Sequence, residues 1–141
     1  DYQMALLEDH RPAMVADLRT RPGARKMYRA WVKRCIHSPH SLVLVAECDG
    51  EPVGYTQVGI RRNIPIFRLE WVAEITDLYV REWHRGKGVA TMLKDEVWAW
   101  LREKGVTRAA LNMLPDNRRA ENVYRHWGFG AFFVYMRADV K

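Results

Sequence analysis

The sequence is poor in cysteine and has no long hydrophobic run, no repeat and no low-complexity segment. Its two cysteines, Cys35 and Cys48, show no paired spacing, which argues against a disulfide scaffold and favours reduced thiols in a cytoplasmic protein. No apolar run approaches the roughly 18 residues that a membrane-spanning helix needs, so we expect no membrane partner. The five histidines form no cluster with ligand spacing, so we expect no metal.

The composition fits one folded domain with a basic surface. Of the 141 residues, 48% are hydrophobic and 28% are charged, a balance that can bury a core and excludes a disordered chain. The formal net charge of +6 suits an anionic partner, which can be nucleic acid, an anionic surface or an anionic small molecule. Because the basic residues are scattered and no recognition motif is present, nucleic acid is the weaker expectation.

Hydrophobic periodicity and turn residues predict four helices and five strands. Asp49-Gly50 is a strong hairpin signal, because both residues tolerate a positive φ. The helices are expected within Leu6 to Arg19, from Met27 to Ile36, from Val89 until Gly105, and from Asn117 to Trp127. The strands are expected at Leu42 to Glu47, Val53 to Ile60, Trp71 to Val80, Arg108 to Met113 and Phe132 to Ala138.

The order of these elements predicts an α/β fold built on a mixed sheet. The first three strands form an antiparallel meander. The strands before and after the Val89 helix should run parallel, because a helix crosses over between them. The remaining neighbours are expected to be antiparallel, with helices on both faces of the sheet.

The segment Arg85 to Ala90, between a strand and a helix, has the form of a phosphate-binding turn. Its two glycines let a phosphate approach the backbone, and the N–H groups and dipole of the following helix favour an anion. Two other phosphate loops fit poorly. Arg81 stands where the Walker pattern needs its first glycine, and Thr91 stands where the dinucleotide fingerprint needs its last. The segment therefore predicts a pyrophosphate site.

Two motifs make this sequence resemble the GCN5-related N-acetyltransferase (GNAT) superfamily. Arg85-x-x-Gly88-x-Ala90 is similar to the coenzyme A loop of that family. The family's second motif, N-x-x-A-x-x-x-Y-x-x-x-G-F, is matched by Asn117, Ala120, Tyr124 and Gly128-Phe129. The resemblance covers Leu42 to Ala138, and the family's first strand has no clear counterpart. It implies a single acetyltransferase domain over residues 1–141, with a mostly antiparallel mixed sheet and a splayed parallel strand pair.

The resemblance also implies that acetyl-CoA is the cosubstrate and that no metal takes part. In the family, pantetheine pairs with the backbone of the strand before the loop, and a backbone N–H of Leu78 or Tyr79 would form a small oxyanion hole. The residues expected to bind the coenzyme are Leu78, Tyr79, Val80, Arg85, Gly86, Lys87, Gly88, Val89, Ala90, Asn117, Ala120 and Tyr124. Three further arginines, Arg118, Arg119 and Arg125, could reach the phosphates of the nucleotide.

Attack of an amine on a thioester needs a group that takes a proton and a group that returns one. Glu74 is the expected base, acting through water, because it precedes Gly88 by the offset at which the histone acetylase branch carries its glutamate. Regular alternation places Glu74 and Leu78 on one face of the strand, and Asp77 on the other unless a bulge intervenes. Asp77 is therefore the second candidate. By the same resemblance, Tyr124 is the expected general acid toward the leaving sulfur.

The function implied by the resemblance is transfer of an acetyl group from acetyl-CoA to a primary amine, by direct attack in a ternary complex. The alternative on the same fold is a non-catalytic domain that binds or senses acyl-CoA. Fold and loop do not choose among a protein N-terminus, a lysine side chain, a polyamine and an antibiotic amine as the acceptor. Dimers are common in the family, so a homodimer stays open beside a monomer.

Overall fold

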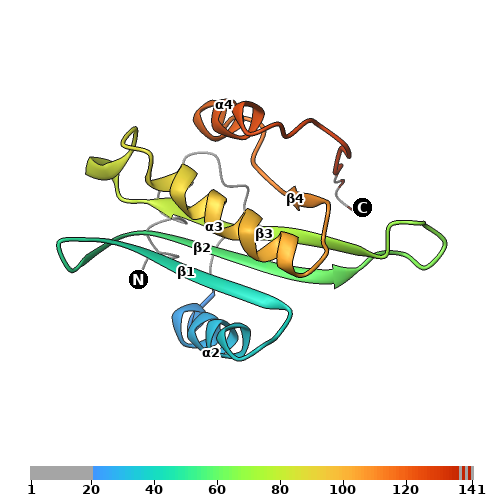
Figure 1. Cartoon of the computed structure of the whole chain (residues 1–141), viewed down its shortest axis with the longest axis horizontal. Helices are drawn as coiled ribbons and strands as arrows, with labels where there is room; N and C mark the ends of the chain where they lie inside the picture. The colour runs from blue at the N-terminus through green and yellow to red at the C-terminus, as the bar shows by residue number, and fades with distance from the viewer. Residues whose placement is uncertain (1–20, 137, 139, 141) are drawn as a thin grey trace.

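The computed structural model describes residues 21–136, 138 and 140, which form a four-stranded sheet with helices on both faces (Figure 1). The helix expected within Leu6 to Arg19 lies outside the described residues. In chain order the elements are α2 (Ala24–Ile36), β1 (Ser41–Cys48), β2 (Glu51–Arg62), β3 (Trp71–Val80), the short 3₁₀ helix η3 (Glu82–His84), α3 (Val89–Glu103), β4 (Ala109–Leu111) and α4 (Arg118–His126).

The sheet has the order β1-β2-β3-β4, and its pairing confirms the predicted mixed sheet. β1 pairs with β2 and β2 with β3 in antiparallel fashion, whereas β3 and β4 are parallel and are joined through α3. Asp49 and Gly50 have φ angles of 51° and 78°, so the first hairpin closes as its sequence predicts. The parallel pair is short, because only Ala73 to Ile75 of β3 lie opposite β4.

The main core lies between α3 and the sheet. Leu93, Val97 and Leu101 recur every four residues on α3 and are buried, which is the pattern of a helix that covers a sheet with one stripe. Val97 and Leu101 pack with Val58 of β2 and with Ile75 of β3. Burial of these side chains fixes the start of α3 above the end of β3.

The opposite face of the sheet is covered by α2, below the sheet in Figure 1. Cys35 of α2 is buried there, and its sulfur accepts a hydrogen bond of 3.2 Å from the side-chain amide of Gln57 on β2. Tyr28, two turns earlier on α2, contacts the same face through its hydroxyl group. This interface is therefore more polar than the one under α3.

A β-bulge in β3 corrects one expectation about side-chain direction. Gln57 of β2 lies opposite Asp77, and the next residue, Val58, lies opposite Ile75, so Thr76 is an extra residue in β3. Regular alternation along the strand had predicted that Glu74 and Leu78 lie on the same face. Beyond the bulge, Asp77 instead shares the α2 face with Glu74, and Leu78 shares the α3 face with Ile75.

The prediction of a last strand from Phe132 to Ala138 is wrong for the part of that segment that the structure describes. Residues 129–136 have no strand pairing, and the side chains of 132–136 are between 83% and 87% exposed. A strand is stable only when its backbone groups are paired and one face is covered. Aromatic and β-branched composition favours a strand but provides no partner, and none pairs with this segment in the described chain.

Candidate active site

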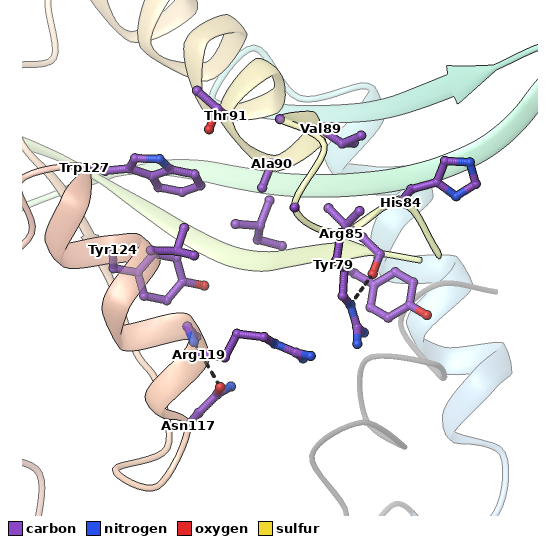
Figure 2. Close-up of a pocket in the computed structure, with 16 residues that line it drawn as sticks. Tyr79, His84, Arg85, Val89, Ala90, Thr91, Asn117, Arg119, Tyr124 and Trp127 are labelled. Atoms are coloured by element: carbon purple, nitrogen blue, oxygen red, sulfur yellow. Dashed lines mark hydrogen bonds between the residues drawn. The ribbon is translucent and has the colours of Figure 1, made fainter. Parts of the chain in front are cut away.

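A cavity of about 530 Å³ opens between the end of β3, the start of α3 and one face of α4 (Figure 2). This volume is in the range of small-molecule sites. The lining residues are Leu78, Tyr79, Val80, His84, Arg85, Gly86, Gly88, Val89, Ala90, Thr91, Asn117, Arg119, Ala120, Val123, Tyr124 and Trp127. Three segments far apart in the sequence therefore meet at one site, and both sequence motifs contribute to it.

The loop between η3 and α3 has the backbone geometry of an anion site. Gly86 and Gly88 have φ angles of 71° and 84°, which other residues rarely adopt. Gly88 is the N-cap of α3, and its carbonyl accepts the first helical hydrogen bond, from the Met92 N–H at 3.0 Å. The N–H groups at the beginning of a helix have no helical partner, so they and the helix dipole favour a negative charge at this edge of the cavity.

Two arginines bring positive charge to the cavity from different elements. Arg85 follows η3, and its Nε donates a hydrogen bond of 2.9 Å to the Val80 carbonyl, which holds the side chain against the end of β3. Its guanidinium carbon lies 5.7 Å from the centre of the Tyr79 ring. Arg119 projects from α4, on the other wall (Figure 2). Lys87 is exposed and does not line the cavity.

The inner face of α4 is formed by residues spaced three and four apart. Asn117 is the N-cap, and its side-chain oxygen accepts a hydrogen bond of 3.1 Å from the Ala120 N–H. Tyr124 lies one turn beyond Ala120, with its hydroxyl directed into the cavity (Figure 2). Its ring centre lies 5.8 Å from that of Trp127, and burial raises the pKa of the hydroxyl above its ordinary value. Tyr124 is therefore protonated at neutral pH and can donate a proton.

The Gly128-Phe129 pair ends α4 and fixes the tyrosine. Gly128 has a φ of 89°, the left-handed conformation that commonly ends a helix, and its N–H bonds to the Arg125 carbonyl at 3.0 Å. Phe129 then packs against the core, and its ring centre lies 5.9 Å from the rings of both Tyr124 and Trp98. The end of the second motif thus has a structural role.

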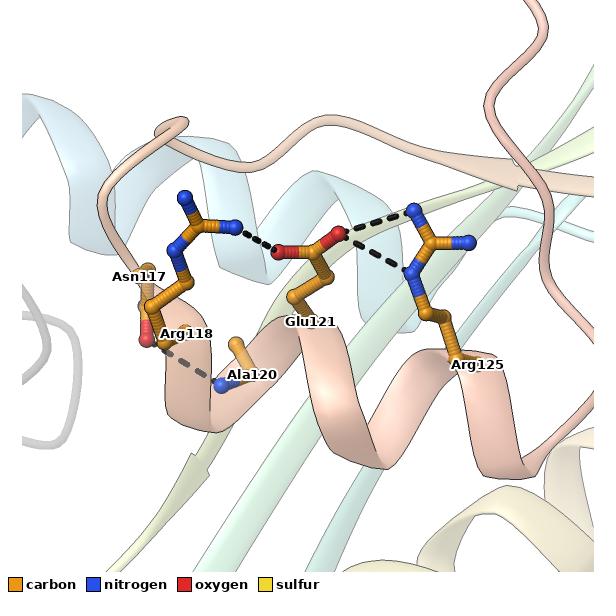
Figure 3. Close-up of polar contacts among 5 residues, drawn as sticks. All are labelled: Asn117, Arg118, Ala120, Glu121 and Arg125. Atoms are coloured by element: carbon orange, nitrogen blue, oxygen red, sulfur yellow. Dashed lines mark hydrogen bonds and ion pairs between the residues drawn. The ribbon is translucent and has the colours of Figure 1, made fainter.

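The outer face of α4 carries a surface network of charges, drawn in Figure 3. Glu121 accepts hydrogen bonds from Arg118 at 3.0 Å and from Arg125 at 2.9 Å, one turn away on either side. The hydrogen bond from Arg125, and to a smaller extent the one from Arg118, lowers the pKa of the Glu121 carboxyl. Of the three arginines that sequence analysis placed near the phosphates, only Arg119 lines the cavity.

Glu74, the base expected from the sequence, is outside the set of residues that line the cavity. Its carboxylate forms an ion pair of 3.3 Å with Arg61 and accepts a hydrogen bond of 3.1 Å from the Asn112 side chain. It lies within the paired part of β3, opposite Ala110 of β4. Glu74 and Tyr124 therefore do not line the same cavity.

Sequence reasoning missed four of the cavity residues and named a fifth, Arg119, only as a possible phosphate contact. Val123 and Trp127 could have been found by extending the helical spacing of Ala120 and Tyr124 by one turn. His84 and Thr91 flank the predicted loop and carry no separate signal. The Nδ1 atom of His84 is buried and has no hydrogen-bond partner in the described residues.

The described residues contain no group of three histidine, cysteine, aspartate or glutamate side chains placed to hold a metal ion. Within the same part of the chain, no helix has both the length and the apolar character needed to cross a membrane. Cys35 is buried and Cys48 exposed, and both are free thiols.

The mixed sheet, the glycine loop at the start of α3 and the cavity beside it define an α/β protein with a candidate anion-binding site. The family is given by comparison with known families. The model of the acetyltransferase (GNAT) family matches residues 4–129, so the chain belongs to this family. No curated protein sequence matches the chain significantly.

Solved structures share the fold at low sequence identity. The aminoglycoside antibiotic 6'-N-acetyltransferase AAC(6')-IG from Acinetobacter haemolyticus has a TM-score of 0.69 and 23% identity, covering 82% of each chain. AAC(6')-Iy, in complex with a bisubstrate analogue of coenzyme A and acetylneamine, has a TM-score of 0.71 and 22% identity over 82% of this chain and 80% of that one. The tetramutant of the BH1408 protein from Bacillus halodurans has a TM-score of 0.79 and 18% identity over 99% of this chain and 90% of that one. These likenesses show the fold.

Proposed function

We propose that this protein transfers an acetyl group from acetyl-CoA to a primary amine, by direct attack of the amine in a ternary complex. The observation that carries the proposal is the joining of two features in one cavity. An anion-binding loop with two left-handed glycines forms one end, and the hydroxyl of Tyr124 points into the same space. Membership of the GNAT family gives the class of reaction.

The residues present fit coenzyme A. Gly86, Gly88 and the first N–H groups of α3 would hold the pyrophosphate, since a Cβ at Gly88 would meet no atom within 4 Å and the space in front of the loop is open. Arg85 and Arg119 would add positive charge from two walls. Beyond Ile75, β3 has no strand partner on its β4 side in the described chain, so the backbone near Leu78 is open to pairing with pantetheine, although the Val80 carbonyl already accepts a hydrogen bond from Arg85.

Tyr124 would serve as the general acid. When bound, the coenzyme supplies a thioester whose sulfur leaves as a thiolate. Burial keeps the Tyr124 hydroxyl protonated at neutral pH, so it has a proton to give to that sulfur. Packing against Trp127 and Phe129 holds the ring in one orientation, which is the condition for efficient proton donation.

Two carboxylates on the α2 face of β3 are candidates for the base. Glu74 is the residue that the sequence predicts, and it would act through water. Asp77 is the alternative, because the bulge at Thr76 turns it to the same face, next to the cavity-lining Leu78. Matched amide variants of the two carboxylates, compared across pH, would separate these assignments.

The proposal is tested by two measurements on the whole chain. Calorimetric titration with acetyl-CoA should show binding to the wild type and none to Gly88→Asp, which places a carboxylate at the phosphate loop. Release of free thiol from acetyl-CoA should then be measured against a panel of primary amines. Absence of coenzyme binding at millimolar concentration would contradict the proposal entirely. Binding without turnover on any amine would favour the non-catalytic acyl-CoA-binding domain instead.

A further inference from the structure

The excess positive charge of this protein is concentrated on α2 and the turn before it. The chain has 23 lysines and arginines and 17 acidic residues, which give the net charge of +6. Residues 21–40 contain six of the basic residues and none of the acidic ones, so the rest of the chain has 17 of each and is neutral overall. Basic residues are scattered along the whole chain, but in this segment no acidic residue balances them. The six are Arg21, Arg25, Lys26, Arg29, Lys33 and Arg34.

Four of these residues form a basic face on α2, which consists of Lys26, Arg29, Lys33 and Arg34. All four residues are exposed. Lys26 and Lys33 are two helical turns apart, so they lie in one row about 10 Å long. Arg29 lies on one flank of that row and Arg34 on the other, because each residue turns the helix by about 100°. The face therefore presents positive charge as a strip with two flanks.

The basic face is turned away from the sheet. The other side of α2 packs on the sheet, where Tyr28 and Cys35 make hydrogen bonds to residues of β3 and β2. Lys26 and Lys33 each precede one of these inward residues by two positions, or about 200° around the helix, and so lie on the outer side. In Figure 1, α2 covers the face of the sheet opposite α3, and no residue of α2 is among those that line the cavity. The phosphates of a bound coenzyme therefore do not account for this charge.

A DNA duplex matches the basic face in shape and charge. A helix with its side chains is about 10–12 Å across, and the major groove of B-DNA is about 12 Å wide, with a phosphate backbone along each edge. A row of lysines with an arginine on either flank can therefore reach both strands, and arginine suits phosphate because it can donate two hydrogen bonds at once.

Two other anionic surfaces match the face less well. A helix that binds a lipid surface needs a free apolar side, whereas the apolar side of α2 is already packed on the sheet. An acidic peptide carries its charges on one chain, so it would leave one flank of the row unused.

We propose that the basic face of α2 binds the phosphate backbone of duplex DNA. The site is separate from the coenzyme cavity, so both can be occupied together. The helix has no asparagine or glutamine, the side chains that read adenine, so we expect phosphate contacts with little preference for sequence.

The test is the fluorescence anisotropy of a labelled DNA duplex of about two helical turns, titrated with the whole chain between about 50 and 200 mM salt. The wild type should bind with a micromolar Kd. The logarithm of its association constant should fall with the logarithm of the salt concentration with a slope of about −4, close to one per neutralised phosphate.

The triple variant Lys26→Ala, Lys33→Ala and Arg34→Ala removes three charges at exposed positions and places the best helix former there. It should reduce the slope to about −1 and raise the Kd at least about 30-fold at about 100 mM salt. The matched control removes three exposed charges outside the segment and should keep the slope of the wild type. Both variants should keep the melting temperature and the acetyl-CoA Kd of the wild type. The control substitutions are Arg102→Ala, Lys104→Ala and Arg108→Ala.

Four outcomes would overturn the inference. Absence of DNA binding at about 50 mM salt would mean that the face is only solvated. Equal weakening by the two triple variants would mean that net charge, and not α2, attracts DNA. Displacement of the DNA by saturating acetyl-CoA would place it at the coenzyme loop instead. Tighter binding to phosphatidylserine vesicles, or equal competition by polyglutamate and unlabelled duplex, would assign the face to a membrane or an acidic protein. None of these measurements involves acetyl transfer, so the proposed function is tested separately.

Discussion

The packing of α3 on β2 gives a sharp test of how the coenzyme loop is positioned. A Cβ added at Gly54 would lie 2.9 Å from Cγ1 of Val89, 3.2 Å from Cδ1 of Leu93 and 3.4 Å from the Tyr79 carbonyl oxygen. Carbon atoms in contact normally lie about 3.5–4.0 Å apart, so Gly54→Ala must push the first turn of α3 away by roughly half an ångström. Overpacking of this kind costs about 1–3 kcal/mol of stability.

Gly59→Ala is the matched control, because it lies on the same strand and its Cβ would meet no atom within 4 Å. Any Gly→Ala change also stabilises by reducing the entropy of the unfolded chain, by about 0.4–1 kcal/mol. That gain is common to both variants, so their difference isolates the steric effect. We expect Gly54→Ala to have a free energy of unfolding about 1–3 kcal/mol below that of Gly59→Ala, as measured by urea denaturation.

The same change should weaken coenzyme binding. Val89 is the first residue of α3 and lines the cavity, so moving it displaces N–H groups that would face the phosphates. We expect the Kd for acetyl-CoA to rise about tenfold in Gly54→Ala, the equivalent of 1.4 kcal/mol, and to stay unchanged in Gly59→Ala. Equal stability and equal Kd in the two variants would refute the packing argument. Lower stability with an unchanged Kd would refute the link between α3 and the phosphate site.

Four further predictions concern single side chains. Tyr124→Phe keeps the packed ring and should lower turnover about 10- to 1000-fold with a near-normal coenzyme Kd; full activity would remove the acid role. In Glu74→Gln, the loss of turnover should shrink as pH rises, since more of the amine is already neutral, whereas a loss independent of pH would assign the base elsewhere. Asn117→Ala should lower the free energy of unfolding by about 1 kcal/mol through loss of the cap, and Asn117→Asp should retain it. Burial raises the pKa of the Asp77 carboxyl above its ordinary value of 3.8. The contribution of Asp77 to the free energy of unfolding is therefore full below pH 3.8 and is lost as the pH rises through the raised pKa. Urea unfolding from pH 4 upward should show this loss of stability in the wild type and not in Asp77→Asn.

Elements that are marked by short sequence patterns were predicted correctly from the sequence. β3 has the predicted bounds, Trp71–Val80, and α3 begins at Val89 as the glycine loop indicates. The predicted helix from Asn117 to Trp127 is α4 with its two caps, because capping residues are read from the sequence. Elements that depend on distant partners were harder. β4 covers only Ala109–Leu111 of the predicted Arg108 to Met113, because pairing with β3 ends at Ile75.

In the candidate site, too, short sequence patterns led to the correct residues, and features that depend on distant partners did not. The loop from Arg85 and the spacing of Ala120 and Tyr124 are short patterns, and both led to cavity residues. The bulge at Thr76 arises from the register between β2 and β3, which no single segment encodes. The face on which Asp77 lies, and its hydrogen bond with the Tyr28 hydroxyl, could therefore be found only from the folded chain.

The two faces of α4 have separate roles, and this difference determines which of its residues can be substituted. A helix of nine residues is marginal by itself, so the ion pairs on its outer face help to maintain its shape independently of the cavity (Figure 3). Substitutions at inward positions such as Val123 can then alter the shape of the binding space while Arg118, Glu121 and Arg125 keep the turn spacing. The wall of the cavity can thus vary in chemistry while the helix that carries it keeps its shape.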